Sequence, residues 1–155
     1  MRARGWVLAA AAVLVVGLAL AATAEKPTMG AVGSVWFLVP PIPGVAPNGA
    51  AGHFTFSVRS YDDGDSAGNA SLCVFDGVSG KLMAVLTGKD VWYVHPEADG
   101  IRFWVQLELK EGSIHPMLLM PLSWWVSDGG HVDEVRFHGL GPFEALKGNV
   151  TVHGL

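Results

Sequence analysis

The sequence predicts an all-β fold, either an antiparallel β-barrel or a β-sandwich, with roughly 8–10 short strands. Three observations predict it. Apolar and polar residues alternate with a period of two along several segments, which is the pattern of a half-buried strand. Clusters of Gly, Pro, Asn and Asp interrupt these segments about every 8–12 residues, as turns do in such folds. No segment keeps the 3.6-residue period of an amphipathic helix.

The first 24 residues have the three parts of an export signal. Arg2 and Arg4 form a positive start, Trp6–Leu20 is an apolar run, and small residues at 22–24 fit a cleavage site. An uncleaved membrane anchor is the alternative, because the apolar stretch is close to the shortest length that spans a bilayer. We therefore expect a signal peptide at 1–24 and an exported protein that is periplasmic, cell-surface or extracellular. A membrane contact is expected only if the leader is uncleaved.

The chain beyond the leader is acidic. Arg2 and Arg4 lie within the leader and all 14 acidic residues lie after it, so its removal changes the formal charge from −4 to −6. An acidic surface without a stripe of Lys and Arg repels phosphate backbones, so nucleic acid is not an expected partner. Cys73 is the only cysteine, which excludes an internal disulfide. Its apolar neighbours favour a small buried residue over a nucleophile or a cross-link.

Residues 25–51 are expected to hold an N-terminal strand and a Pro-rich arm. The strand is expected at Ser34–Val39, and four prolines follow it within residues 40–49. Proline supports neither a helix interior nor a central strand. The arm is therefore interpreted as an extended connection, which either wraps the domain or serves as a flexible linker.

Residues 52–155 are expected to form the antiparallel β domain. Phe54, Phe56 and Val58 share one face of its first strand. Residues 101–110 form the clearest strand, with apolar side chains on one face and polar ones on the other, whereas Met117–Val126 is nearly all apolar. The remaining strands are expected, in order, at residues 70–75, 81–86, 91–95, 132–138 and 150–152, and a loop is expected to begin at 139–142.

Strand and turn signals recur in a definite order along the domain. They are Phe56-Ser57-Val58-Arg59, Val74-Phe75-Asp76 with Gly80-Lys81-Leu82, Phe103 to Leu109, Asp128-Gly129-Gly130, and a closing segment from Leu146 to His153. With these pieces, residues 54–153 resemble the small all-β domain that follows choice-of-anchor modules in bacterial surface and secreted proteins. The resemblance implies a closed or nearly closed antiparallel sheet outside the cell. That family has no established chemistry, so the resemblance implies no catalytic residues. The Pro-rich arm and Met117–Val126 depart from its pattern.

Motifs for metal binding and catalysis are weak in this sequence. The six histidines lack the close pairs that a zinc site needs, and no cofactor is expected. Asp62, Asp63 and Asp65 share one turn, where carboxylate oxygens could hold calcium. Their spacing does not fit the twelve-residue calcium loop, so a solvated turn is the favoured interpretation. Gly77-Val78-Ser79-Gly80 lacks the form of a nucleophile elbow, and we expect a protein that is not an enzyme.

Tryptophans are the candidate contact residues. Trp104 falls on the polar face of its strand. Trp124 and Trp125 are adjacent, so they point to opposite sides of a strand and cannot both enter one core. With Trp92, these residues are expected to meet an apolar, glycan or protein ligand, or a second copy of the chain in a homo-oligomer. The alternative is a purely structural role, in which the Pro-rich arm or a partner subunit covers these tryptophans.

Two functions are compatible with these patterns. The first is an exported, non-catalytic binding or assembly module at or outside the cell surface. The alternative is a carrier, a barrel that holds an apolar small molecule in its interior. That interior would be lined by Phe54, Phe56, Phe103, Val105 and Leu107. An enzyme with a dispersed site is a third hypothesis.

Overall fold

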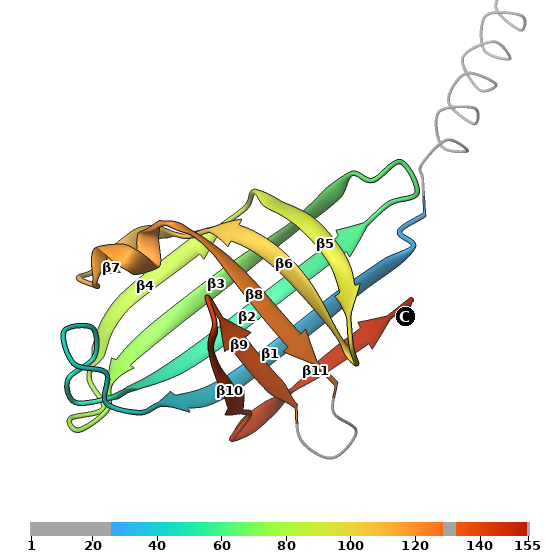
Figure 1. Ribbon diagram of the computed structural model, residues 1–155. Coiled ribbons are helices and arrows are strands. Elements are labelled where there is room, and N and C mark those ends of the chain that lie inside the picture. The colour runs from blue at the N-terminus through green and yellow to red at the C-terminus, as the bar shows by residue number, and fades with distance from the viewer. Residues whose placement is uncertain (1–25, 129–132, 155) are drawn as a thin grey trace, which may run out of the picture.

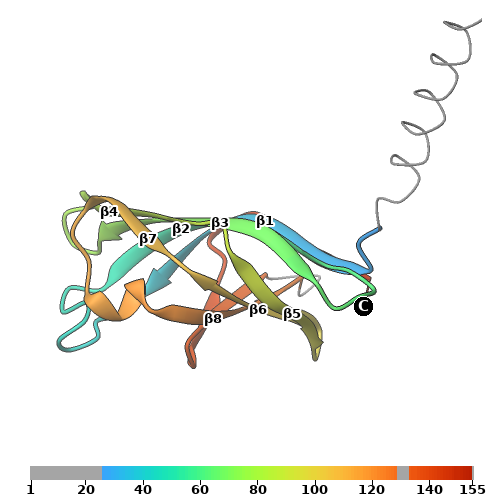
Figure 2. The same cartoon turned by 90° about the horizontal axis from the view of Figure 1, so that it is seen from above.

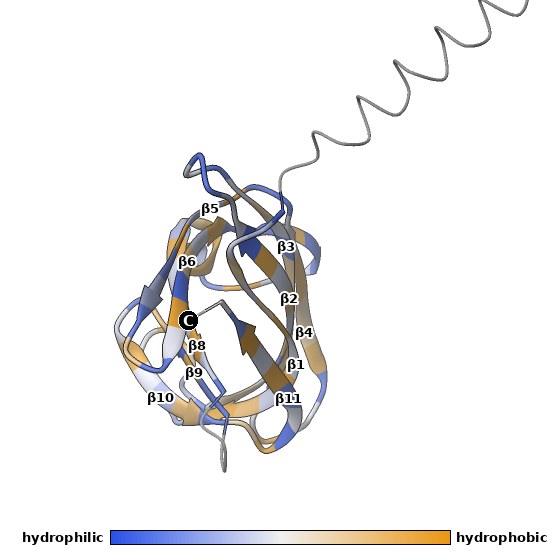
Figure 3. Ribbon diagram, turned by 90° about the vertical axis from the view of Figure 1, so that its right-hand side faces the viewer, coloured by the Kyte–Doolittle hydropathy of each residue, from blue (hydrophilic) through white to orange (hydrophobic). Residues whose placement is uncertain are grey.

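Two antiparallel β-sheets face each other across one hydrophobic core (Figures 1 and 2). The computed structural model describes residues 26–128 and 133–154, so the expected leader at 1–24 lies outside the described residues. An end-on view shows the two sheets on opposite sides of the core (Figure 3). The expected all-β class is confirmed. Within the described residues, no helix is long and apolar enough to cross a membrane.

The larger sheet has six strands in the order β11-β1-β2-β3-β4-β7. Its long strands β1, β2 and β3 pair with one another in continuous antiparallel register. Phe54, Phe56 and Val58 point into the core, as the alternation predicts. The strands are β1 (Met29–Val39), β2 (Ala50–Ser60), β3 (Ser66–Asp76), β4 (Leu82–Gly88), β7 (Glu108–Gly112) and β11 (Lys147–His153).

The smaller sheet has five strands in the order β10-β9-β8-β6-β5. A short 3₁₀-helix, η1 (Pro116–Leu119), precedes β8 and lies at the same end of the molecule as the Pro-rich segment (Figure 1). The strands are β5 (Val91–Glu97), β6 (Gly100–Gln106), β8 (Pro121–Ser127), β9 (Glu134–Phe137) and β10 (Leu140–Glu144).

The segment expected as one strand at 101–110 is two strands in different sheets. β6 ends at Gln106 in the five-stranded sheet, and β7 begins at Glu108 in the six-stranded sheet. Leu107, between them, is 1% exposed. The alternation of apolar and polar residues in the sequence continues to Leu109, although every residue of β7 is exposed, so the pattern does not reveal the switch. The loop expected to begin at 139–142 is also corrected, because β10 begins inside it. The apolar run Met117–Val126 covers most of η1 and most of β8.

Aromatic rings fill the middle of the core. Phe54 stacks on Trp124 with ring centroids 4.0 Å apart, and the Phe103 ring, in β6 beside Trp124, lies 6.4 Å from the Phe54 ring. The residues expected to line a carrier lumen are packed together here and each is almost fully buried; they are Phe54, Phe56, Phe103, Val105 and Leu107. A ligand therefore has no space among them.

The N-terminal strand and the Pro-rich arm share the domain of the later strands. β1 lies between β11 and β2 within the six-stranded sheet. The described residues of the 25–51 segment are therefore part of the β domain and do not form a separate arm. The Pro-rich residues form a tight hairpin between β1 and β2. Ile42 N–H donates to Ala46 O at 2.8 Å, and Ala46 N–H donates to Ile42 O at 2.9 Å. The expected extended connection is thus a compact loop.

Candidate functional site: an apolar pocket at one end of the sheets

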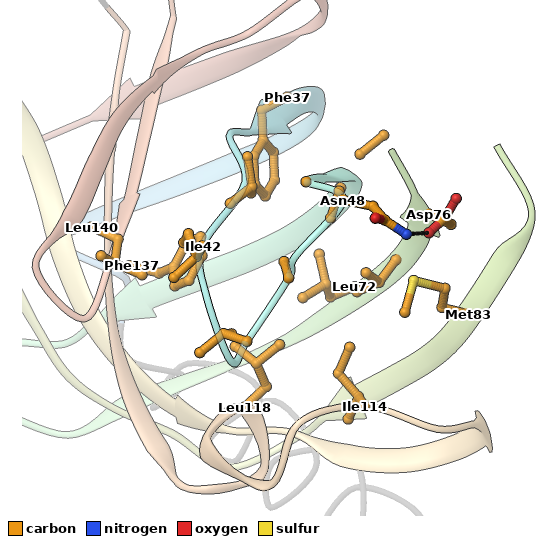
Figure 4. A pocket seen from close by; sticks show the side chains of 18 of the residues that line it. Phe37, Ile42, Asn48, Leu72, Asp76, Met83, Ile114, Leu118, Phe137 and Leu140 are labelled. Carbon is orange, nitrogen blue, oxygen red and sulfur yellow. Dashed lines mark hydrogen bonds between the residues drawn. The ribbon is translucent and has the colours of Figure 1, made fainter. Parts of the chain in front are cut away.

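An apolar pocket of about 130 Å³ lies at the end of the molecule where the Pro-rich hairpin meets η1 (Figure 4). The pocket is bounded by residues of β1 to β4, by the hairpin, by η1 and the residues just before it, and by Phe137 and Leu140. These segments are far apart in the sequence. The topology of the two sheets brings them together at this end.

The six-stranded sheet forms the floor of the pocket. Phe37 in β1 and Leu72 and Val74 in β3 are inward positions of their strands. Gly52 in β2 lies opposite Phe37, and a Cβ atom at Gly52 would lie 2.5 Å from Phe37 Cζ. Because Gly52 has no side chain, the Phe37 ring can lie directly over it. Gly52 thus sets the position of that ring in the floor of the pocket.

The Pro-rich hairpin forms one wall. Ile42, Val45 and Ala46 line the pocket from this segment. The hairpin is fastened to the β3–β4 turn, because Gly77 N–H donates to Gly49 O at 3.3 Å and Asn48 Nδ2 donates to Asp76 Oδ2 at 3.3 Å. The hairpin and the β3–β4 turn thus hold each other in place, so this wall of the pocket is formed in the absence of a ligand.

η1 and the segment before it form the opposite wall. Leu118 is buried against the core, and Ile114 packs beside it. His115 begins the helical turn: its Nδ1 accepts the Met117 N–H at 3.2 Å, and its carbonyl oxygen accepts the Leu118 N–H at 3.0 Å. This cap fixes the turn and directs Leu118 inward. Met83 from β4 completes this side of the pocket (Figure 4).

Asp76 is the ionisable group among the residues that line the pocket. Its Oδ1 accepts the backbone N–H groups of Ser79 at 2.6 Å and Val78 at 3.1 Å, and its Oδ2 accepts from Asn48. The Ser79 backbone N–H contributes most, and together these bonds lower the pKa of the Asp76 carboxyl from 3.8 to about 2. The rim is therefore negative at neutral pH, whereas the lining is mostly hydrocarbon.

The four tryptophans expected to form one contact surface are divided between two environments. Trp124 is fully buried against Phe54, so it does not reach an exterior ligand. Its indole N–H has no hydrogen-bond partner in the part of the chain that the structure describes. Trp125, the next residue, points to the opposite side of β8, where Trp92 and Trp104 also lie. The outer face of the five-stranded sheet thus carries three of the four.

The exposed part of that outer face is small. The Arg136 guanidinium lies 4.5 Å from the Trp125 ring centroid, and Trp125 Nε1 donates to Glu97 O at 3.1 Å, so Trp125 is buried. Trp104 is half-buried and lies directly opposite Trp92, which is 38% exposed. Of the three tryptophans on this face, Trp92 and Trp104 are therefore the ones that a ligand can reach.

Two other sequence candidates have structural roles. In the turn between β2 and β3, Asp63 Oδ1 accepts the Asp65 N–H at 2.8 Å, which is the hydrogen bond of an Asx turn. Across residues 26–128 and 133–154, no cluster of three or more His, Cys, Asp or Glu side chains could hold a metal ion. Cys73 lies on the outward face of β3 and is half-buried, which departs from the buried position that its apolar neighbours favoured.

Sequence patterns alone did not point to the pocket. Ile42 and Val45 were expected in a connection, and Leu118 in an apolar run. One available signal was the presence of these apolar residues within a Pro-rich stretch, where exposed loops are usually polar. Comparisons of the chain with protein-family models, with curated proteins and with solved structures give no match.

Proposed function

We propose that this chain is an exported, non-catalytic binding protein that takes a compact apolar ligand, or the apolar end of a larger one, into the end pocket. The observation that carries the proposal is the pocket itself, about 130 Å³ and lined by aliphatic, aromatic and thioether side chains. Apolar cavities of about 150 Å³ stay dry and bind benzene or xenon. Export is supported by the leader at 1–24, which has the three parts of a signal peptide.

The charge of the rim narrows the ligand class. Asp76 keeps its carboxylate ionised at neutral pH, since three hydrogen-bond donors hold it. An anionic head group at the mouth would meet this like charge, which is destabilising near an apolar surface. A neutral ring or short alkyl chain therefore fits the pocket better than a carboxylate of the same size.

Methyl NMR tests the proposal directly. Toluene titrated into protein carrying ¹³C-labelled methyl groups should shift the Met83, Ile114 and Leu118 signals along one saturable isotherm. Ala46→Phe places a ring in the pocket and should abolish these shifts. Val78→Phe is the matched control, because Val78 is 80% exposed on the β3–β4 turn, and this variant should bind like the parent.

Two results would refute binding in the pocket. One is the absence of a saturable shift at these three methyl groups up to the solubility limit of toluene. The other is unchanged toluene binding by a folded Ala46→Phe variant. Benzoate, which adds a charge to a ring of similar size, should bind more weakly than toluene at pH 7.

A second candidate function is glycan binding on the Trp92–Trp104 pair. The two rings lie opposite each other across β5 and β6, and Gln106 adds an exposed amide to the same face. Such aromatic surfaces combine a large apolar area with polar edges. An oligosaccharide that uses this face should change tryptophan fluorescence in the parent and in Ala46→Phe, but not in Trp104→Ala. No fluorescence response across cell-wall and storage glycans would argue against this function.

A further inference from the structure

The outer face of the six-stranded sheet carries neutral rows across its four central strands. The strand register places Trp36, His53, Cys73 and Val85 side by side, one from each of β1 to β4. The neighbouring row contains only hydroxyl side chains, and its members are Ser34, Thr55, Ser71 and Thr87. Leu38, on the same face, is 55% exposed. A neutral, partly apolar sheet face of this breadth is typical of an interface.

The aromatic part of this face is flat. The Trp36 ring stacks on the His53 ring with centroids 4.5 Å apart and an interplanar angle of 7°. Phe75 lies 5.2 Å from Trp36 on the same side. Ser34 Oγ lies 3.0 Å from His53 Nε2, which helps to fix the imidazole. The rings are thus held in one arrangement before any partner arrives, which lowers the entropy that association costs.

Opposite charges stand at the two ends of the first row. Lys147 in β11 pairs in register with Trp36, and Glu111 in β7 pairs with Val85. Both side chains are exposed, and among the described residues neither forms an ion pair within the chain. Glu108, at the end of the hydroxyl row, is already paired with Lys110 at 2.7 Å. The row therefore has a cation at one edge and an anion at the other.

We propose that this face binds a second copy of the chain around a two-fold axis that runs parallel to the strands between β2 and β3. Such an axis reverses the row end for end. Lys147 then faces the partner's Glu111, Trp36 faces the partner's Val85, and His53 faces the partner's Cys73. Opposite charges meet at both edges, and a large side chain meets a small one in between. Hydroxyl groups face hydroxyl groups in the neighbouring row.

The geometry is that of aligned sheet packing, in which strand directions of two sheets stay within about 30° of each other. A two-fold interface uses the same patch on both copies, so a self-complementary row is what it requires. The face lies on the opposite side of the six-stranded sheet from the floor of the end pocket, which is formed by the inward residues Phe37, Leu72 and Val74. Self-association and ligand binding can therefore be tested separately.

Charge reversal tests the proposal by sedimentation equilibrium of the purified protein. Lys147→Glu and Glu111→Lys each place two like-charge pairs in the dimer, so each should weaken the dimer at least about tenfold. The double variant K147E/E111K restores opposite charges and should recover most of the parent's affinity. Lys89→Glu and Asp62→Lys make the same charge changes in turns outside the face, and these controls should dimerise like the parent.

Four outcomes would overturn the proposal. They are a parent protein that stays monomeric at every concentration, single reversals that leave the dimer unchanged, a double variant no tighter than the single ones, and control variants as weak as the single reversals. Because all the substituted side chains are exposed, circular dichroism and thermal unfolding should match the parent in every variant.

Discussion

Burial of individual side chains decides which tryptophans can meet a ligand. Trp124 and Trp125 differ by one position in β8, and that single step places one ring in the core and the other on the outer face. Trp124 contacts Phe54 on the facing sheet, so it joins the two sheets. Its indole N–H has no partner among the residues that the structure describes, and burial without a hydrogen bond carries a free-energy cost. Trp124 is therefore a stability residue.

Trp124→Ala should lower the free energy of unfolding by about 3–5 kcal/mol, because it removes a fully buried ring and leaves a cavity. Trp104→Ala removes a half-buried ring from the outer face and should cost less than about 1.5 kcal/mol. Urea unfolding followed by far-UV circular dichroism measures both. Equal costs for the two variants would contradict this assignment of inside and outside.

Asp76 links the pocket rim to pH. Its folded-state pKa of about 2 lies below its ordinary value of 3.8, so ionised Asp76 stabilises the folded protein above pH 3.8. That contribution is lost as pH falls from 3.8 to about 2. Asp76→Asn should therefore be less stable than the parent at pH 6, and the gap should narrow between pH 4 and pH 2. Urea unfolding across this range measures the gap, and a gap independent of pH would contradict the role of the carboxylate charge.

Strands and loops differ in how far the sequence alone determines them. Alternation along β2 predicts which residues face the core, because the side-chain period of a strand is fixed by its geometry. The same alternation runs from β6 into β7 without a break, and so hides the change of sheet at Leu107. The Pro-rich hairpin is also only partly determined by its sequence. Its prolines exclude a helix, but its folded form depends on backbone hydrogen bonds such as those between Ile42 and Ala46.

Gly52 shows how one strand position shapes the pocket. Gly52→Ala would bring a Cβ atom to 2.5 Å from Phe37 Cζ and should displace that ring. We expect a loss of about 1–3 kcal/mol in the free energy of unfolding, the usual cost of overpacking. Ser57→Ala, at an exposed position of the same strand, should stay within about 0.5 kcal/mol of the parent. Thermal and urea unfolding measure both variants, and a neutral Gly52→Ala would contradict the close approach of Phe37.

At the scale of the whole molecule, the distribution of large and small residues explains where the pocket lies. Phe54, Phe103 and Trp124 fill the middle of the core. At the end, small residues stand among the larger lining side chains, including Ala46, Gly49 and Ala50, and they leave the space that the pocket occupies. The sequence predicted two-faced strands but not this pocket. Its lining comes from segments spread from Phe37 to Leu140, and only the strand order brings them together.

Crystallography under xenon pressure tests the central claim most directly, because xenon enters apolar cavities that are empty of water. We expect a xenon atom in the end pocket, in contact with Phe37, Met83 and Leu118, and none between Phe54 and Phe103. The site should disappear in Ala46→Phe and persist in Val78→Phe. Ordered water in the pocket instead of xenon, or a pocket filled by its own side chains, would contradict a preformed apolar binding site.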